Sequence, residues 1–162
     1  METETWIERL LLDQLTTHDR RYKHDYAGVE RTTDDLVAAC TKLDAITRDG
    51  GTELPSLEQL FTMDEAFESE VEAALRTLQD KGLIERVGEQ DRLGPPFEPG
   101  DYGTTTVWEP TVEGRAEARA IREAYSTAVD ALVESYGADS EEFREEIVSV
   151  ARTHGILPSY FG

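Results

Sequence analysis

Residues 75–86, LRTLQDKGLIER, join the end of an amphipathic helix to the beginning of a strand. At about 100° per residue, three apolar side chains of the helix, Ala74, Leu75 and Leu78, lie within about 60° of Val71 and form a stripe with it. Gly82 ends the helix because glycine takes the left-handed conformation without a steric penalty. The stretch therefore predicts a helix over 68–81 followed at once by a strand over 83–87.

Two further helices are predicted before this stretch. The first covers residues 33–48, buries part of its surface, and stops at the glycine pair 50–51. A short helix then begins after Ser56, whose side chain can cap it. Residues 62–67 are polar enough to form a turn before the amphipathic helix.

The residues after the strand predict a β-hairpin. Residues 88–103 contain seven glycines and prolines, so we expect a long loop there. Residues 104–109, TTTVWE, are β-branched and aromatic and predict the returning strand. Val71, Leu75, Leu78 and Trp108 are expected to pack together as one unit.

Helices flank this unit on both sides. Thr5 and Glu8 form a capping box for a helix that ends near residue 17. Thr111 caps a helix over 112–136, and Ser140 opens a last one through about residue 153. The predicted fold class is mainly α with a small β-hairpin.

Two motifs in this order resemble winged helix-turn-helix regulators of the MarR and PadR type. Residues 75–86 are similar to the end of a recognition helix that runs into the first wing strand. Residues 108–115, WEPTVEGR, are similar to the second wing strand followed by the Thr-x-x-Gly-Arg that opens the next helix. The resemblance covers about residues 33–120. It implies a winged helix-turn-helix over 32–114, with an N-terminal helix and connector over 1–31 and C-terminal helices over 115–162.

The resemblance implies a transcriptional regulator that binds double-stranded DNA as a homodimer. The implied contact residues lie on the recognition helix, on the wing and in the connector; they are Ser69, Arg76 and Thr77, then Arg86, Arg92, Thr104 and Thr105, and finally Arg20, Arg21 and Lys23. The connector also reads as an ordinary interhelix loop whose cations pair with neighbouring carboxylates. The stripes of the terminal helices could form the dimer interface or pack on the chain's own core.

The charge of the recognition helix opens an alternative. DNA affinity comes largely from cations that neutralise phosphates, yet Arg76 is the only cation on the outward face. Four carboxylates lie near it, on Glu65, Glu68, Glu70 and Glu72. A winged helix that binds a protein partner instead of DNA is therefore the second hypothesis.

The whole chain is strongly acidic. Its 162 residues carry 35 carboxylates against 16 lysines and arginines, a net charge of −19. Lysine is scarce and asparagine absent, and the pattern resembles proteins of extreme halophiles, here of haloarchaeal type. Molar salt shortens the Debye length to about 3 Å and screens self-repulsion. An acidic mesophilic protein is the alternative.

Catalytic and membrane signals are weak. The histidines lack metal-ligand spacing, and no glycine-rich phosphate loop occurs, so we predict no enzyme, no metal and no cofactor. Cys40 lies in an apolar helical pattern and is expected to be an inert core thiol. The acidic N-terminus does not resemble a signal peptide, and no run of apolar residues is long enough for a membrane span. We therefore expect a cytoplasmic protein without a membrane partner.

Overall fold

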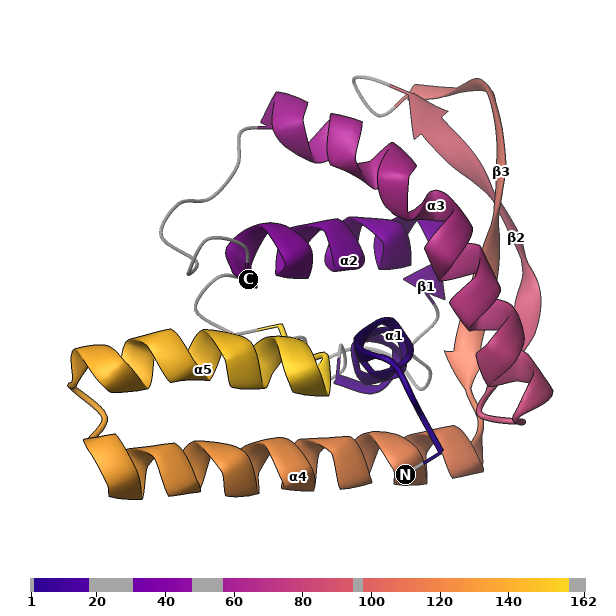
Figure 1. Ribbon diagram of the computed structural model, residues 1–162. Helices are drawn as coiled ribbons and strands as arrows, with labels where there is room; N and C mark the ends of the chain where they lie inside the picture. Colours follow the sequence, from indigo (N-terminus) through magenta and orange to yellow (C-terminus); the bar gives the residue numbers. More distant parts are fainter. Residues whose placement is uncertain (1, 18–30, 48–56, 95–97, 158–162) are drawn as a thin grey trace.

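The computed structural model describes residues 2–17, 31–47, 57–94 and 98–157. This part of the chain forms five helices and one three-stranded antiparallel sheet, so the protein is mainly helical with a small sheet (Figure 1). In chain order the elements are α1 (Trp6–Thr17), β1 (Arg31–Thr32), α2 (Thr33–Thr47), α3 (Leu57–Asp80), β2 (Ile84–Gly94), β3 (Glu98–Pro110), α4 (Val112–Tyr136) and α5 (Glu141–His154).

The sheet has the order β1-β3-β2, with β3 in the centre. The predicted antiparallel hairpin is confirmed, but the loop predicted over 88–103 is wrong, because β2 and β3 pair through most of it. A register shift makes Val87 an extra, exposed residue of β2. Beyond this bulge the ribbon formed by β2 and β3 extends past the hydrophobic core. The residues of this part therefore lack the alternation of apolar and polar side chains by which strands are predicted.

The two-residue strand β1 was not predicted from the sequence. Arg31 pairs with Trp108 and Thr32 with Val107, immediately before α2 begins. A strand of two residues is too short to leave a periodic pattern. Its pairing nevertheless fixes the start of α2 against the centre of the sheet.

Helix α3 corrects a second prediction. Residues 62–67 were expected to form a turn between a short helix and the helix over 68–81, but one helix of 24 residues runs from Leu57 to Asp80. The segment TMDEAF contains neither glycine nor proline, and Met, Glu and Ala all favour helix. Polarity alone therefore does not end the helix here.

The hydrophobic core is organised around α1. Leu10, Leu11, Leu12 and Leu15 are completely buried, and the figure shows α1 surrounded by the other helices (Figure 1). The predicted stripe of α3 is confirmed, because its four apolar residues and Trp108 belong to the same buried cluster. The apolar face of α1 is thus covered by the chain itself and is not available to a second copy.

The two motifs of the sequence contact each other. The backbone N–H of Thr111 donates to the Leu83 carbonyl at 3.0 Å, and the Thr111 hydroxyl donates to the Gly82 carbonyl at 2.7 Å. The same hydroxyl accepts from the Gly114 N–H at 3.1 Å and so caps α4. Gly82 has φ +75°, which turns the chain from α3 into β2. These hydrogen bonds therefore hold the α3–β2 junction and the β3–α4 junction together as one joint.

Helices α4 and α5 form an antiparallel pair, with α4 below α1 and α5 beside it (Figure 1). The predicted N-cap of α5 is confirmed, since the Ser140 side chain accepts from the Phe143 N–H, and Gly155 ends the helix in the left-handed conformation. Two ion pairs tie this pair to the rest of the core. Arg122 donates from Nε and Nη2 to both oxygens of the fully buried Asp13, and Arg152 donates to Asp44 at 2.7 Å.

Candidate nucleic-acid interface

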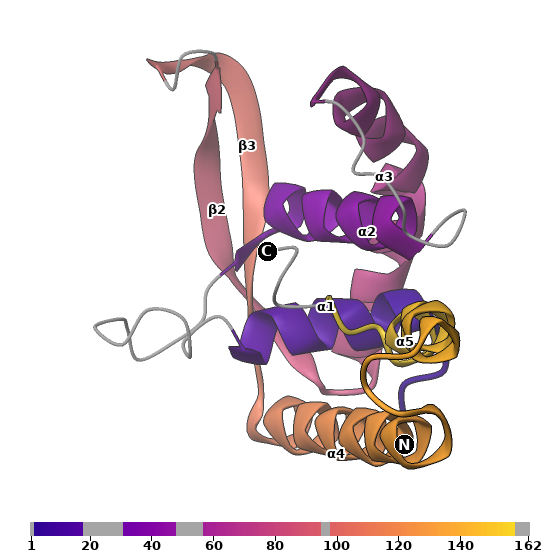
Figure 2. The ribbon, with the colours of Figure 1, turned by 90° about the vertical axis from the view of Figure 1, so that its left-hand side faces the viewer.

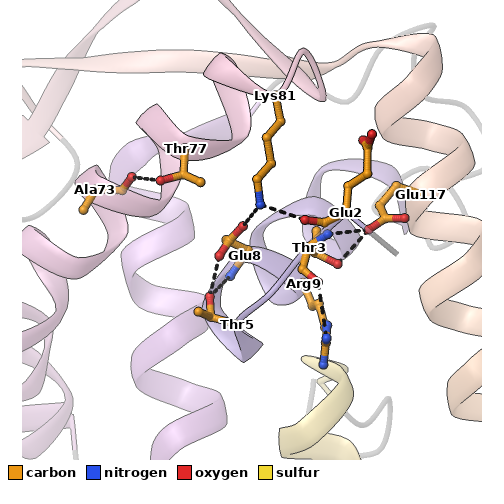
Figure 3. A network of polar contacts seen from close by, with 9 residues as sticks. All are labelled: Glu2, Thr3, Thr5, Glu8, Arg9, Ala73, Thr77, Lys81 and Glu117. Carbon is orange, nitrogen blue, oxygen red and sulfur yellow. Dashed lines mark hydrogen bonds and ion pairs between the residues drawn. The ribbon is translucent and has the colours of Figure 1, made fainter.

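Over residues 68–80, the outward face of α3 is exposed as the helical wheel predicts. Of the predicted contact residues, Ser69, Arg76 and Thr77 all lie on this exposed face. The Thr77 hydroxyl donates to the Ala73 carbonyl at 3.0 Å, so its proton is engaged within the helix (Figure 3). Arg76 has an exposed side chain at the centre of this face.

The end of α3 is fastened to the N-terminal segment. Lys81 Nζ donates to Glu8 Oε1 at 3.0 Å and to the Glu2 carbonyl at 2.7 Å (Figure 3). Glu8 is nearly buried and also accepts from the Thr5 hydroxyl, as the capping box predicts. Lys81 is therefore a structural cation that joins α3 to α1.

The N-terminal segment and the start of α1 also form hydrogen bonds with α4 and α5. Thr3 is only 2% exposed, and both its backbone N–H and its hydroxyl donate to Glu117 Oε2, at 2.7 and 2.8 Å. Arg9 donates from Nη2 to the Thr3 carbonyl and from Nη1 to the Thr153 carbonyl. This network holds α3 in a fixed position relative to the helices below it.

The two predicted arginines of the ribbon are both paired. Arg92 donates from Nε and Nη2 to the two oxygens of Asp34 at 2.8 and 3.2 Å, which links β2 to the start of α2. Arg86 donates to Glu89 at 2.7 Å, with both side chains half exposed. Because exposed ion pairs are weak, a phosphate can replace either carboxylate at little cost.

The threonines of β3 occupy different environments. Thr104 is exposed, whereas Thr105 is only 6% exposed and its hydroxyl accepts from the Asp34 N–H at 3.3 Å. Because strand residues alternate between faces, adjacent threonines cannot both point outward. Thr105 therefore supports α2 and cannot reach a ligand on the surface. Arg20, Arg21 and Lys23 lie outside the described residues.

The ribbon and α3 project toward the same side of the molecule. In both views, the N-terminal half of α3 and the turn end of the ribbon lie opposite α4, with α2 between them (Figures 1 and 2). The sequence-based prediction divided this half of α3 into a short helix and a turn. The first part of a continuous helix and the ribbon are thus the two projecting elements.

The charge of α3 does not favour an anionic ligand. The helix carries seven carboxylates and a single cation, Arg76. Four of these carboxylates lie on the exposed surface described for the second half of the helix, on Glu68, Glu70, Glu72 and Asp80. Any contact of α3 with DNA must therefore depend on screening of these charges by salt.

Cys40 is buried in the core, as predicted from the apolar pattern around it. Burial, together with the nearby carboxylates of Glu70 and Asp44, raises the pKa of its thiol to about 12. Among the residues that the structure describes, no three His, Cys, Asp or Glu side chains are grouped as a metal site would require. No helix in the same part of the chain has the length and apolarity of a membrane span.

The Cys40 thiol is expected to be unreactive while the chain is folded. A pKa of about 12 in place of 9.0 leaves about a thousandfold less thiolate at pH 8, and thiolate is the reactive form. Titration with a chromogenic disulfide at pH 8 should detect one thiol per chain only after guanidinium is added. Rapid reaction of one equivalent before unfolding would show that the thiol is accessible.

Comparison with known proteins gave no relative. No family model, no curated protein and no solved structure matched the chain.

Proposed function

We propose that the chain is a winged helix-turn-helix protein that binds double-stranded DNA as a dimer and regulates transcription. The observation that supports this most directly is the topology, in which the order α1-β1-α2-α3-β2-β3 is combined with the sheet order β1-β3-β2. In a winged helix, α2 and α3 are the helix pair, α3 enters the major groove, and the β2–β3 ribbon is the wing. In this proposal the helix pair is α2 and α3, and the connection between them comprises residues 48–56, which lie outside the described residues.

In this proposal Arg76 and Ser69 contact DNA from α3, and Arg86, Arg92 and Thr104 contact the backbone from the wing. Arg92 exchanges Asp34 for a phosphate, and Arg86 exchanges Glu89. Each exchange replaces one anion by another, so its net electrostatic gain is small. Base contacts and shape must then contribute more to affinity than in a basic DNA-binding protein.

DNA binding is expected to resist salt. A protein that neutralises six phosphates loses about a thousandfold in affinity over a fourfold increase in salt. Here the same increase also screens the repulsion between a chain of net charge −19 and the duplex. Fluorescence anisotropy with DNA from upstream of the chain's own gene should give dissociation constants at 0.5 and 2 M KCl within about tenfold of each other.

Arg76→Ala is expected to weaken specific binding by about 1–3 kcal/mol in the same assay, because it removes the only cation of α3. Arg144→Ala, an exposed arginine of α5, is the matched control and should bind as the unmodified chain does. Equal affinity for upstream DNA and for an unrelated duplex at both salt concentrations would argue against DNA-specific function.

The dimer is proposed to form through the C-terminal half of α4 and the N-terminal half of α5. Val133 and Tyr136 are 40% and 46% exposed, and neighbouring apolar side chains of both helices are only half buried, namely Val129, Leu132, Phe143 and Ile147. Their pairing in a two-fold interface would remove this apolar surface from water.

Val133→Glu is expected to convert a dimer to a monomer, measured by light scattering after size exclusion. Val112→Glu is the matched control, because Val112 is 74% exposed at the opposite end of α4. A single chain mass for the unmodified protein, or a dimer that both substitutions leave intact, would contradict the assignment.

A protein partner is the second candidate, and the charge of α3 favours it. Glu68 and Glu72 lie one turn apart on the exposed surface and would attract a basic partner. Glu68→Lys together with Glu72→Lys should abolish recovery of a stoichiometric partner from native extract. The same reversal at Glu141 and Glu142 of α5 should not. Recovery of nucleic acid without any stoichiometric protein would rule this candidate out.

A further inference from the structure

A pocket of about 440 Å³ lies between α5, the start of α1 and the end of α2. Trp6 lines it from α1 and Thr47 from α2, and one helical face of α5 supplies the remaining side chains, Glu145, Val148, Ser149, Arg152 and Thr153. The volume lies within the range of about 300–1,000 Å³ found for small-molecule sites. None of these residues belongs to the surface proposed to bind DNA.

The guanidinium of Arg152 is held in a fixed orientation in this pocket. Its Nη1 donates to Asp44 Oδ1 at 2.7 Å and to Thr47 Oγ1 at 3.0 Å. Its central carbon lies 4.6 Å from the centroid of the Trp6 ring, a cation–π distance. The Phe67 ring packs on the same indole, with 6.0 Å between the ring centroids and an interplanar angle of 82°. The arginine is therefore positioned before any ligand binds.

The remaining edge of this guanidinium consists of Nε and Nη2. Within the described part of the chain, Nε and Nη2 of Arg152 donate to no acceptor, and the side chain is 37% exposed. The two N–H groups of this edge match the two oxygens of a carboxylate, which accepts from both at once. A carboxylate can thus bind here without breaking the pair with Asp44.

The other lining residues restrict what the carboxylate can belong to. Trp6 and Val148 offer apolar surface to the body of a ligand. Glu145 lies seven residues before Arg152 on the same helical face, about 10 Å away along the axis at 1.5 Å per residue. Its exposed carboxylate repels a second negative charge at the far end of a ligand.

We propose that this pocket binds a small monocarboxylate with an apolar body. The carboxylate accepts from Nε and Nη2 of Arg152, the body lies against Trp6 and Val148, and Glu145 selects against dianions. Thr47 is the last residue of α2, so an occupant contacts the helix that precedes α3. The site itself does not depend on whether α3 binds DNA.

The test uses cyclohexanecarboxylate as the probe and the uncharged cyclohexanecarboxamide as its control. The chain contains two tryptophans, so a ¹⁵N correlation spectrum gives two indole N–H resonances. Trp108 is the internal control, because it is 8% exposed and its Nε1 donates to Thr33. The Trp6 resonance should shift saturably with the carboxylate, and the amide should bind at least about tenfold more weakly.

Variants separate recognition from loss of folding. Arg152→Lys keeps the charge beside Asp44 but removes the two-pronged edge, and it should weaken binding at least about tenfold. Ser149→Phe fills the pocket from an exposed position and should abolish binding, whereas Ser126→Phe on α4 should not. Glu145→Gln should strengthen binding of the dianion trans-1,4-cyclohexanedicarboxylate and leave the monoanion nearly unchanged.

Three results would overturn the proposal: no shift of Trp6 with the carboxylate, equal shifts with the amide, or equal shifts of both indoles. Unchanged affinity in Ser149→Phe would do the same, because an occupant of this pocket cannot coexist with the added ring.

Discussion

Replacing Gly114 by alanine is expected to lower the free energy of unfolding by roughly 4 kcal/mol, at the upper end of single-substitution effects. A Cβ atom at this position would overlap the Leu83 carbonyl oxygen and lie 3.3 Å from Leu12 Cδ1. That oxygen accepts the Thr111 N–H, so it cannot retreat without breaking the joint between the two motifs. A decrease in the free energy of unfolding would point to this overlap, because alanine in place of glycine normally stabilises a helix by about 1 kcal/mol.

Chemical denaturation followed by circular dichroism measures this effect. Gly88→Ala is the matched control, because a Cβ at Gly88 meets no atom within 4 Å. It should change the free energy of unfolding by less than about 1 kcal/mol. Equal stability of the Gly114 and Gly88 variants would mean that α4 does not approach Leu83 closely.

Replacing Arg122 by methionine is expected to cost about 3 kcal/mol. Asp13 is completely buried and accepts two charged hydrogen bonds from Arg122, at 2.7 and 2.8 Å. Removing one partner of a buried ion pair costs about 3–5 kcal/mol, and the 36% exposure of Arg122 places the effect at the lower end. The loss should appear as a lower denaturation midpoint with an unchanged slope.

Two further variants identify the cause. Asp13→Leu combined with Arg122→Met should recover most of the loss, because it removes the buried charge together with its partner. Arg86→Met breaks an ion pair whose members are both 51% exposed, and it should cost less than about 0.5 kcal/mol. If the double variant were less stable than Arg122→Met alone, the stability would come from packing around Asp13 and not from the charge pair.

Some features of the interface could be predicted from local sequence. The exposure of Ser69, Arg76 and Thr77 follows from helical periodicity, because the opposite stripe is so apolar that only one face can be buried. The length of α3 could not be predicted in the same way. Residues 62–67 are polar and contain no helix breaker, and periodicity does not distinguish an exposed turn from an exposed helix.

Which charged residues form ion pairs could not be predicted from the sequence either. Arg92 and Asp34 are 58 residues apart, and Asp13 and Arg122 are 109 apart, so no spacing rule connects them. The same holds for Arg152, whose partner Asp44 and whose neighbour Trp6 come from other helices. The pocket beside it therefore had no signal in the sequence.

The sequence by itself determined the positions of most helices and the core-facing parts of the two hairpin strands, because caps, glycines and apolar periodicity act over a few residues. Only the tertiary structure decided which cations are engaged by carboxylates, why Gly114 must lack a side chain, and where a cavity remains. These depend on the approach of elements far apart in the chain, and that approach is fixed by the burial of α1 among all the other helices.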